Sequence, residues 1–212
     1  MRLAVVAILA TLAVVPTADA AVGDHAGHNH SNERLSTLQE PQPTLAAPKV
    51  EVIEFFWYGC PHCYQLEPAI SKWLAKPPKD TVFKRIPAIP SDAWAHMATM
   101  YYTFEALGSI DRMHMKVFEA LHKERLRLDQ KPVREAWLAK HGIDVTKYLE
   151  VEKSFTVVTN VQRARQLTRA YRVDSVPRLV VGGRYATSPE QAGGTDAVFT
   201  VVDEAIARVR PK

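Results

Sequence analysis

The sequence predicts a mixed α/β fold in which a strand–helix–strand unit, a helical block and a strand–strand–helix unit follow one another. Short runs of β-branched and aromatic residues occur at residues 49–57 and 81–86, with an amphipathic segment between them. Residues 91 to about 172 instead repeat their apolar positions at helical spacing. A second pair of strand-like runs begins at residue 175 and is followed by a final helical pattern.

The first 20 residues have the pattern of a secretory signal peptide. Arg2 provides a positive start, residues 3–15 are apolar, and Ala18 and Ala20 mark a cleavage site after Ala20 or Ala21. The apolar stretch is too short to span a membrane. Because export leads to a compartment in which disulfides persist, we expect the protein in a bacterial periplasm.

Residues 21–48 are rich in Gly, His, Ser, Pro and Gln and have little apolar periodicity, which predicts a disordered leader. His25, His28 and His30 form a small cluster within it. Such a cluster can bind a metal weakly, but no scaffold fixes the geometry of its ligands. We therefore favour a leader that only contacts solvent.

We expect one domain with an insertion: residues 49–90 and 161–212 form the α/β part, and residues 91–160 form the helical insertion. Residues 49–57 are typical of a buried strand. The helix that follows places Cys63, Leu66 and Ile70 on one face, and the prolines near residue 77 end it. Residues 81–86 form the next strand, which this spacing predicts to be parallel to the first.

Helix signals continue through the insertion, and a hairpin follows it. Asp144 is expected to begin one of the inserted helices. Residues 175–181 are the third strand, Gly182-Gly183 is a two-residue turn, and residues 184–187 are the partner strand. Thr195 is expected to cap the final helix.

The two cysteines of the sequence, Cys60 and Cys63, lie in one Cys-x-x-Cys motif directly after the first strand. A strand, a tight turn and a cysteine at a helix start are typical of a redox centre. With no third cysteine, the chain cannot hold a separate structural disulfide. The net charge of +4 comes without a Lys/Arg block of the kind that binds nucleic acid.

Three segments resemble the DsbA family of periplasmic disulfide oxidases, which have a thioredoxin fold with a helical insertion. The segments are Glu54-Phe55-Phe56 leading to Cys60-Pro61-His62-Cys63-Tyr64, the dipeptide Val176-Pro177, and Val180-Val181-Gly182-Gly183-Arg184-Tyr185. The resemblance extends over residues 49–210. It implies an enzyme that introduces disulfides into exported proteins with free cysteines and is reoxidised by a DsbB-type membrane oxidase. We expect a monomer that has no cofactor or metal and does not bind nucleic acid.

The motif Cys60-Pro61-His62-Cys63 would carry the chemistry as a redox-active Cys60–Cys63 disulfide. Exchange needs a thiolate that attacks or leaves easily, and a helix N-terminus favours a negative sulfur on Cys60. Cys63 lies one turn further along and closes the ring. His62 adds a positive or hydrogen-bonding influence on the Cys60 thiolate, and a stabilised thiolate makes the disulfide a strong oxidant.

The resemblance also implies roles for residues outside the motif. A cis peptide bond at Pro177 would expose the Val176 backbone to an extended substrate. Glu54 would be a buried carboxylate that relays protons, because an acidic group within an apolar strand is costly unless it is functional or paired; the alternative is a strand-end glutamate that faces solvent. Lys84 on the neighbouring strand is its expected partner, and Arg178 is expected to place a cation beside the substrate groove.

Other interpretations of the cysteine pair stay open. An inert disulfide would close too small a ring to constrain the unfolded chain much, and a zinc site would need two more ligands, for which the histidines have no paired spacing. A reductase or isomerase would use the same motif, although isomerases of this superfamily have a dimerisation domain that residues 21–48 are too short to form. The third alternative is a non-catalytic peptide- or metal-binding periplasmic protein.

Overall fold

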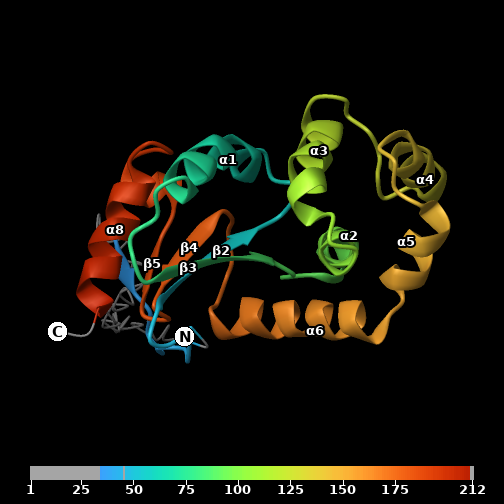
Figure 1. Ribbon diagram of the computed structural model, residues 1–212. Coiled ribbons are helices and arrows are strands. Elements are labelled where there is room, and N and C mark those ends of the chain that lie inside the picture. Colours follow the sequence, from blue (N-terminus) through green and yellow to red (C-terminus); the bar gives the residue numbers. More distant parts are fainter. Residues whose placement is uncertain (1–33, 45, 211–212) are drawn as a thin grey trace, which may run out of the picture. The chain divides into compact units, whose positions relative to one another are not determined.

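The computed structural model describes residues 34–44 and 46–210, so the expected signal peptide and the histidine cluster lie outside the described residues. The strand and helix units follow in the predicted order, which confirms the expected α/β fold with a helical insertion (Figure 1). The elements are β1 (Ser36–Thr37), β2 (Val50–Phe56), α1 (Pro61–Leu74), β3 (Thr81–Pro87), the 3-10 helix η1 (Asp92–Trp94), α2 (Ala95–Ala106), α3 (Ile110–His122), α4 (Lys131–Lys140), α5 (Val145–Glu152), α6 (Phe155–Ala170), β4 (Arg178–Val181), β5 (Tyr185–Thr187), α7 (Pro189–Ala192) and α8 (Val198–Val209).

The described residues form a five-stranded sheet in the order β1-β5-β4-β2-β3. Strand β2 pairs with β3 in parallel, as predicted, and with β4 in antiparallel orientation. Every residue of β2 is buried. A strand that is covered on both faces needs apolar residues at successive positions, which explains why this segment has no alternating pattern.

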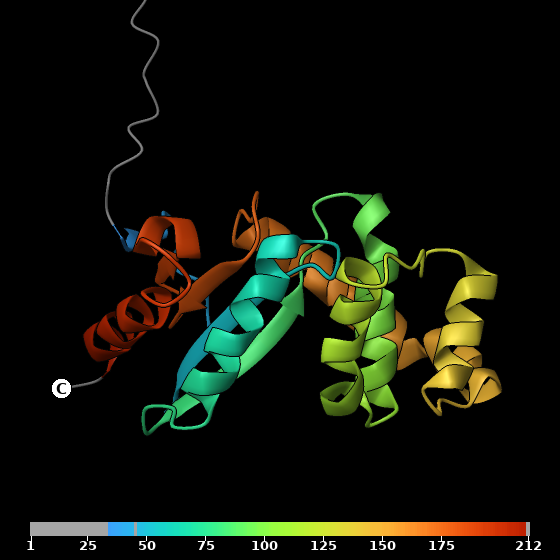
Figure 2. The same ribbon diagram turned by 90° about the horizontal axis from the view of Figure 1, so that it is seen from above.

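Helices cover both faces of the sheet. Helices α1 and α8 pack on one face (Figures 1 and 2). There, Leu66 and Val202 form an apolar cluster with Val52 and Leu179 of the sheet. Helix α6 runs along the other face, and Tyr171, directly after α6, contacts the ring of Phe55 with 5.3 Å between centroids. Because side chains alternate along a strand, neighbouring residues of β2 serve opposite faces.

The inserted helices α2 to α5 pack on one another beside the sheet (Figure 2). Among them, the rings of Phe104 and Tyr148 are in contact, with 5.5 Å between centroids. Asp144 precedes α5 and its side chain accepts a hydrogen bond from the Lys147 amide at 3.0 Å, as predicted. Helix α6 crosses the expected insertion boundary at residue 160, so this boundary does not coincide with a helix end. The predicted cap at Thr195 is wrong, because α8 begins at Val198 after Ala197.

The second half of the expected disordered leader is ordered. Strand β1 pairs with β5 in antiparallel orientation, with Ser36 opposite Ala186. The chain then continues along the hairpin turn, where the Gln42 amide donates to the Gly183 carbonyl at 2.8 Å. A two-residue strand is too short to give a periodic pattern, and its pairing depends on a sheet edge that forms elsewhere in the chain.

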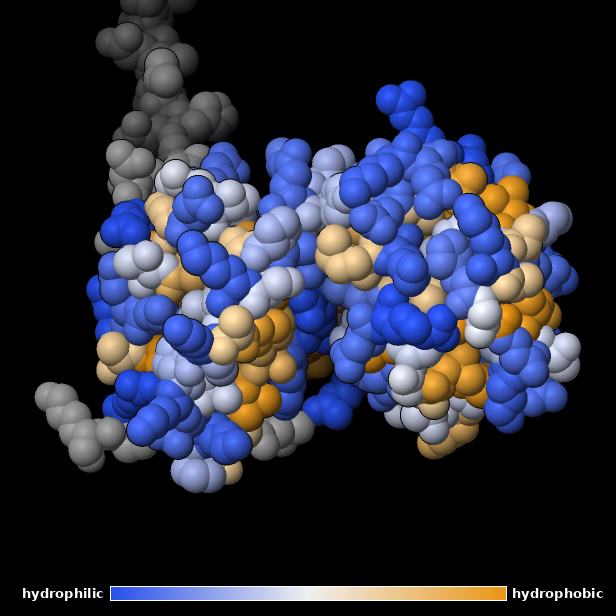
Figure 3. Space-filling model, turned by 45° about the horizontal axis from the view of Figure 1, so that its top comes forward, coloured by the Kyte–Doolittle hydropathy of each residue, from blue (hydrophilic) through white to orange (hydrophobic). Residues whose placement is uncertain are grey.

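The face shown in Figure 3 is mainly hydrophilic and carries separate hydrophobic patches. In the described part of the chain, the large hydrophobic side chains that are exposed are Met115, Phe155 and Val158. Within residues 34–44 and 46–210, no helix has both the length and the hydrophobicity needed to cross a membrane.

The contact between Gln42 and Gly183 predicts a large cost for Gly183→Ala. Gly183 has a φ of +63°, and a Cβ there would overlap the backbone of Gln42. Gly108 has nearly the same φ, +62°, but a Cβ there would meet nothing within 4 Å. We expect Gly108→Ala to lower the free energy of unfolding by about 1 kcal/mol and Gly183→Ala by at least about twice as much, measured by urea denaturation. Equal losses would contradict the packing of the ordered leader on the turn.

Candidate active site

Cys60 lies where β2 passes into α1. It precedes the first helical residue, with φ −91° and ψ 116°, and its carbonyl accepts from the Tyr64 amide at 3.2 Å. Pro61 follows at the first helical position, where the amide has no helical partner and proline is tolerated. The Cys60 sulfur therefore lies beside the unpaired amides of a helix start, which favour negative charge.

Gly59 allows the loop before Cys60 to approach a tryptophan. A Cβ at Gly59 would overlap the indole of Trp57. That indole stacks on Trp94 of η1, with 4.1 Å between ring centroids and 20° between planes. The stack connects the loop that carries Cys60 to the start of the helical insertion.

The two cysteines are free thiols with different environments. The pKa of Cys60 is lowered to about 6, mainly by the hydrogen bond from the Cys63 side chain. Burial opposes this shift, and the backbone amides of Cys63 and His62 and the charge of His62 contribute to it. Burial raises the pKa of Cys63, whose side chain is inaccessible to solvent. Cys60 is therefore the thiolate at neutral pH and Cys63 remains a thiol.

The Val176–Pro177 loop lies against the reactive sulfur. The Val176–Pro177 peptide bond is cis, and the Cys60 sulfur lies 3.4 Å from the Val176 carbonyl oxygen, to which it donates a hydrogen bond when it is protonated. His62 is exposed and its Nδ1 lies 3.3 Å from Oε1 of Gln65. The structure thus brings Cys60, Cys63, Val176 and Pro177 together, with His62 at the surface beside them.

A groove of about 600 Å³ adjoins this centre and is lined by residues of α1, of the Val176–Pro177 loop and of α7 with the residues after it. Arg178, expected to place a cation beside this groove, is not among the lining residues. It lines a separate cavity of about 270 Å³ with Arg172 and lies 3.9 Å from Asp174. The expectation for Arg178 is therefore wrong, because the chain turns into β4 at this residue and its side chain leaves the groove.

Glu54 is fully buried within β2, which excludes the solvent-facing alternative. Its partner is Arg85, with 3.2 Å between Nε and Oε2, and the predicted partner Lys84 is wrong. Lys84 instead binds Glu51. Arg85 is opposite Glu54 in the parallel register, and neighbouring residues of a strand point to opposite faces, so Lys84 and Glu51 meet on the other side of the sheet.

A buried hydrogen-bonded chain extends from Arg85 to the loop before Cys60. Arg85 donates to Oε2 of Glu67 at 2.9 Å, and Oε1 of Glu67 lies 3.0 Å from Nε2 of His114. Nδ1 of His114 lies 2.9 Å from the Tyr58 hydroxyl. Because a carboxylate only accepts, Nε2–H donates to Glu67, and Nδ1 of the neutral ring accepts from Tyr58.

The charges in this network balance at neutral pH. The pKa of Glu54 is raised to about 8, because burial and the charge of Glu67 together outweigh the opposing effect of Arg85. Burial also disfavours ionised Glu67, but the His114 hydrogen bond and Arg85 outweigh it and lower the pKa of Glu67. Burial lowers the pKa of His114 and keeps the ring neutral. Glu54 thus holds a proton while Glu67 and Arg85 carry opposite charges.

The sequence interpretation missed Glu67, Arg85, His114 and Tyr58. One signal was available: Glu67 lies four residues after Cys63, on the helix face that also carries Leu66 and Ile70. A glutamate on a buried helix face requires a partner. The sequence did not identify that partner, because His114 lies on α3, and the packing of α3 against α1 depends on the tertiary structure.

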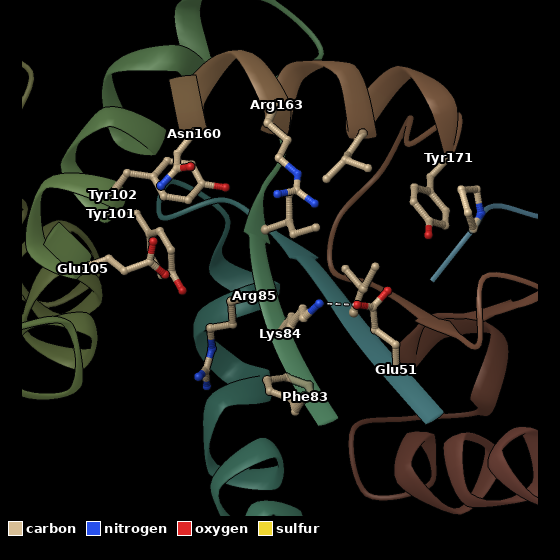
Figure 4. A pocket seen from close by; sticks show the side chains of 14 residues that line it. Glu51, Phe83, Lys84, Arg85, Tyr101, Tyr102, Glu105, Asn160, Arg163 and Tyr171 are labelled. Carbon is tan, nitrogen blue, oxygen red and sulfur yellow. Dashed lines mark hydrogen bonds and ion pairs between the residues drawn. The ribbon is translucent and has the colours of Figure 1, made fainter. Parts of the chain in front are cut away.

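A cavity of about 660 Å³ lies apart from the cysteine site. It lies between β3, α2 and α6, and Figure 4 shows Tyr101, Tyr102 and Arg163 around it and Lys84 with Glu51 at its floor. No cysteine lines it. Among the described residues, no group of three or more His, Cys, Asp or Glu side chains is placed so that it could hold a metal ion.

An acidic thiol at a helix start, a buried thiol one turn away and a cis-proline loop against the sulfur define a thiol:disulfide oxidoreductase with a thioredoxin fold. Comparisons with known proteins agree. Residues 51–205 match the DSBA-like thioredoxin domain. The chain therefore belongs to the DsbA-like thioredoxin domain family, and it acts on the cysteines of substrate proteins.

Similar proteins cover most of the chain. The thiol:disulfide interchange protein DsbA of Bordetella parapertussis is 41% identical over 84% of this chain and 85% of its own length. That of Pseudomonas aeruginosa is 38% identical over 82% of each chain. The crystal structure of Pseudomonas aeruginosa DsbA matches with a TM-score of 0.79 and 37% identity, covering 84% of this chain and 93% of that chain.

The acidic thiol of Cys60 predicts a pH-dependent stability of the reduced protein. Its pKa falls from 9.0 to about 6 on folding, so the folded state releases this proton at lower pH than the unfolded state. The stabilisation is fully present above pH 9 and is lost as the pH falls through about 6. We expect the free energy of unfolding, measured under reducing conditions, to rise with pH across this window.

The control for this prediction is Cys60→Ser, which lacks the titrating thiol and should show a smaller rise across the same window. Thiolate absorbance should also give a midpoint near pH 6 in the unaltered protein. Parallel stability curves for the two proteins would contradict an acidic Cys60.

The buried chain predicts a large cost for His114→Leu. This change leaves the Glu67 carboxylate and the Tyr58 hydroxyl without their His114 partner in a buried site. We expect the free energy of unfolding to fall by about 3 kcal/mol, since each buried unpaired group costs about 1–3 kcal/mol. The matched variant His141→Leu loses one hydrogen bond to the Trp137 carbonyl and should lose less than half as much in the same denaturation experiment. Similar losses would show that the network does not stabilise the fold.

Proposed function

We propose that this protein is a periplasmic disulfide oxidase, which introduces disulfide bonds into exported proteins that have free cysteines. The observation that carries the proposal is the contrast between the acidic thiol of Cys60, with a pKa of about 6, and the buried thiol of Cys63, whose pKa is raised. A stabilised thiolate favours the reduced protein, so the Cys60–Cys63 disulfide accepts electrons readily from a substrate dithiol.

The reaction begins when a substrate thiolate attacks the Cys60 sulfur of the oxidised protein. The bond between Cys60 and Cys63 breaks, a bond between Cys60 and the substrate forms, and Cys63 leaves as a thiolate. Buried Glu54 holds a proton near neutral pH, and once ionised its charge raises the pKa of Cys63, which supports a role as the donor that protonates this leaving thiolate.

A second substrate thiolate then attacks the substrate sulfur of the mixed disulfide. Cys60 leaves as a thiolate, for which its acidic thiol is suited. The substrate dithiol has lost two electrons and two protons in total, and Cys60 and Cys63 have gained the two electrons. The Val176 backbone beside Cys60 supports alignment of an extended substrate during both steps.

The remaining parts of the proposal concern the partner and the location. Residues 1–20 have the pattern of a signal peptide, which supports export to the periplasm. A DsbB-type membrane oxidase would reoxidise the Cys60–Cys63 pair after each turnover, and the protein would act as a monomer. The names of its relatives, thiol:disulfide interchange proteins, support the reaction class.

The test is oxidation of a reduced two-cysteine substrate by the oxidised protein, together with equilibration of the protein against a glutathione redox buffer. We expect the substrate disulfide to form in equal amount to reduced protein, and glutathione to reduce the protein readily because the Cys60 thiolate is stabilised. Matched variants incubated with the oxidised substrate test which cysteine exchanges: in Cys63→Ser the Cys60 thiolate should attack the substrate disulfide, release one substrate thiolate and keep the substrate as a mixed disulfide, whereas Cys60→Ser should form none.

A disulfide that glutathione does not reduce would overturn the oxidase and support a reductase. Full biological activity of Cys60→Ser would support a non-catalytic binding protein.

A further inference from the structure

The groove beside Cys60 contains one acidic side chain, that of Glu190. The groove has a volume of about 600 Å³ and is lined from three places in the chain: the start of α1, the Val176–Pro177 loop, and α7 with the residues after it. The lining includes neither a lysine nor an arginine, and its two ionisable side chains are His62 and Glu190.

The Glu190 carboxylate has no cationic partner in the described part of the chain, and its side chain is exposed. The buried carboxylates near the active site differ from Glu190 in this respect, because Glu54 and Glu67 both contact Arg85. Since Arg178 faces a different cavity, no cation of the cis-proline loop neutralises the groove. The sequence predicted a positive charge beside the substrate, and the structure places a negative charge there.

The backbone holds Glu190 in a defined position. The residue lies in the first turn of α7, where the Ser188 hydroxyl oxygen accepts from the Gln191 amide at 3.2 Å. The chain ends α7 at Gly193 and continues through Gly194, and a Cβ added at either glycine would meet nothing within 4 Å. The carboxylate is therefore on a fixed turn with open space along the groove beside it.

The groove lies beside the position at which a substrate reacts with Cys60. The Cys60 sulfur lies 3.4 Å from the Val176 carbonyl, and Val176 and Pro177 form part of the groove wall. An extended chain that pairs with the Val176 backbone thus places residues on one side of its reacting cysteine in the groove. Among those residues, a lysine or arginine gains an attraction to the carboxylate, and an aspartate or glutamate is repelled.

We propose that Glu190 is a specificity-determining residue that favours protein substrates with a lysine or arginine close to the reacting cysteine. This inference rests on the proposed function, because it concerns the substrate of the same exchange. The step is the first one of that reaction: the peptide thiolate bonds to Cys60, the Cys60–Cys63 bond breaks, and Cys63 takes the electron pair and a proton. No further oxidant is needed, since the oxidised protein accepts the electrons.

The test uses single-cysteine peptides that are identical except for one residue, which is Lys, Gln or Glu and is moved in turn through the positions on both sides of the cysteine. The rate of reaction with the oxidised protein is measured for each peptide. Because a charge near the cysteine also changes the thiol of the peptide itself, the Lys-to-Glu rate ratio of each variant is compared with that of the unaltered protein. This comparison cancels the intrinsic effect of the peptide.

At one or more positions, we expect the ratio to fall about two- to fivefold in Glu190→Gln, the size of one exposed ion pair, and to fall further in Glu190→Lys. High salt should reduce the ratio in the unaltered protein and leave that of Glu190→Gln nearly unchanged. Glu204→Gln is the matched control, because it removes the same charge from an exposed position of α8 that does not line the groove.

An unchanged ratio in Glu190→Gln at every position, or an equal change in Glu204→Gln, would overturn the role of Glu190. The neutral peptide distinguishes this failure from failure of the proposed function. If the oxidised protein does not react with the Gln peptide at all, the exchange reaction itself is wrong. If it reacts with every peptide and the variants show no difference, only the specificity is wrong.

Discussion

The burial of β2 on both faces is the constraint on which the rest of this structure depends. All of its residues are buried, with α1 and α8 packed on one face and α6 on the other. The strand therefore fixes where the helices lie, and the chain leaves its end directly into the loop of Cys60. Displacement of β2 would move the reactive sulfur, the cis-proline loop opposite it and both apolar clusters together.

The same burial explains the pattern of charges around the active site. Glu51 and Glu54 lie within β2, where an unpaired carboxylate would be costly. Successive residues of β3 provide Lys84 and Arg85, one on each face. On the active-site face, burial and the neighbouring charge of Glu67 raise the pKa of Glu54, and Arg85, which also binds Glu67, does not fully offset them. Glu54 therefore retains its proton near neutral pH.

The helical insertion contributes to the active site as well as to the core. His114 of α3 connects Glu67 with Tyr58, and His122 of the same helix lies 2.8 Å from the Tyr58 carbonyl. Trp94 stacks on Trp57 on the other side of this loop. The reaction centre and the groove beside it thus depend on different parts of the chain: the insertion supports the loop before Cys60, whereas α7 provides the acidic side chain of the groove.

The sequence by itself determined the reactive motif, the order of strands and helices, and which cysteine of the pair is the reactive thiolate. These depend on local features: a Cys-x-x-Cys after an apolar strand, and a helix that starts directly after Cys60. Only the tertiary structure decided the partners of the buried charges. A shift of one residue along β3 exchanges Lys84 for Arg85 on the active-site face, and local pattern does not give the register. Contacts between residues far apart in the chain also decide the pairing of β1 with β5, the turn of Arg178 away from the groove, and the positions of His114 and Glu190 near the active site. Spacing along the sequence does not predict such contacts.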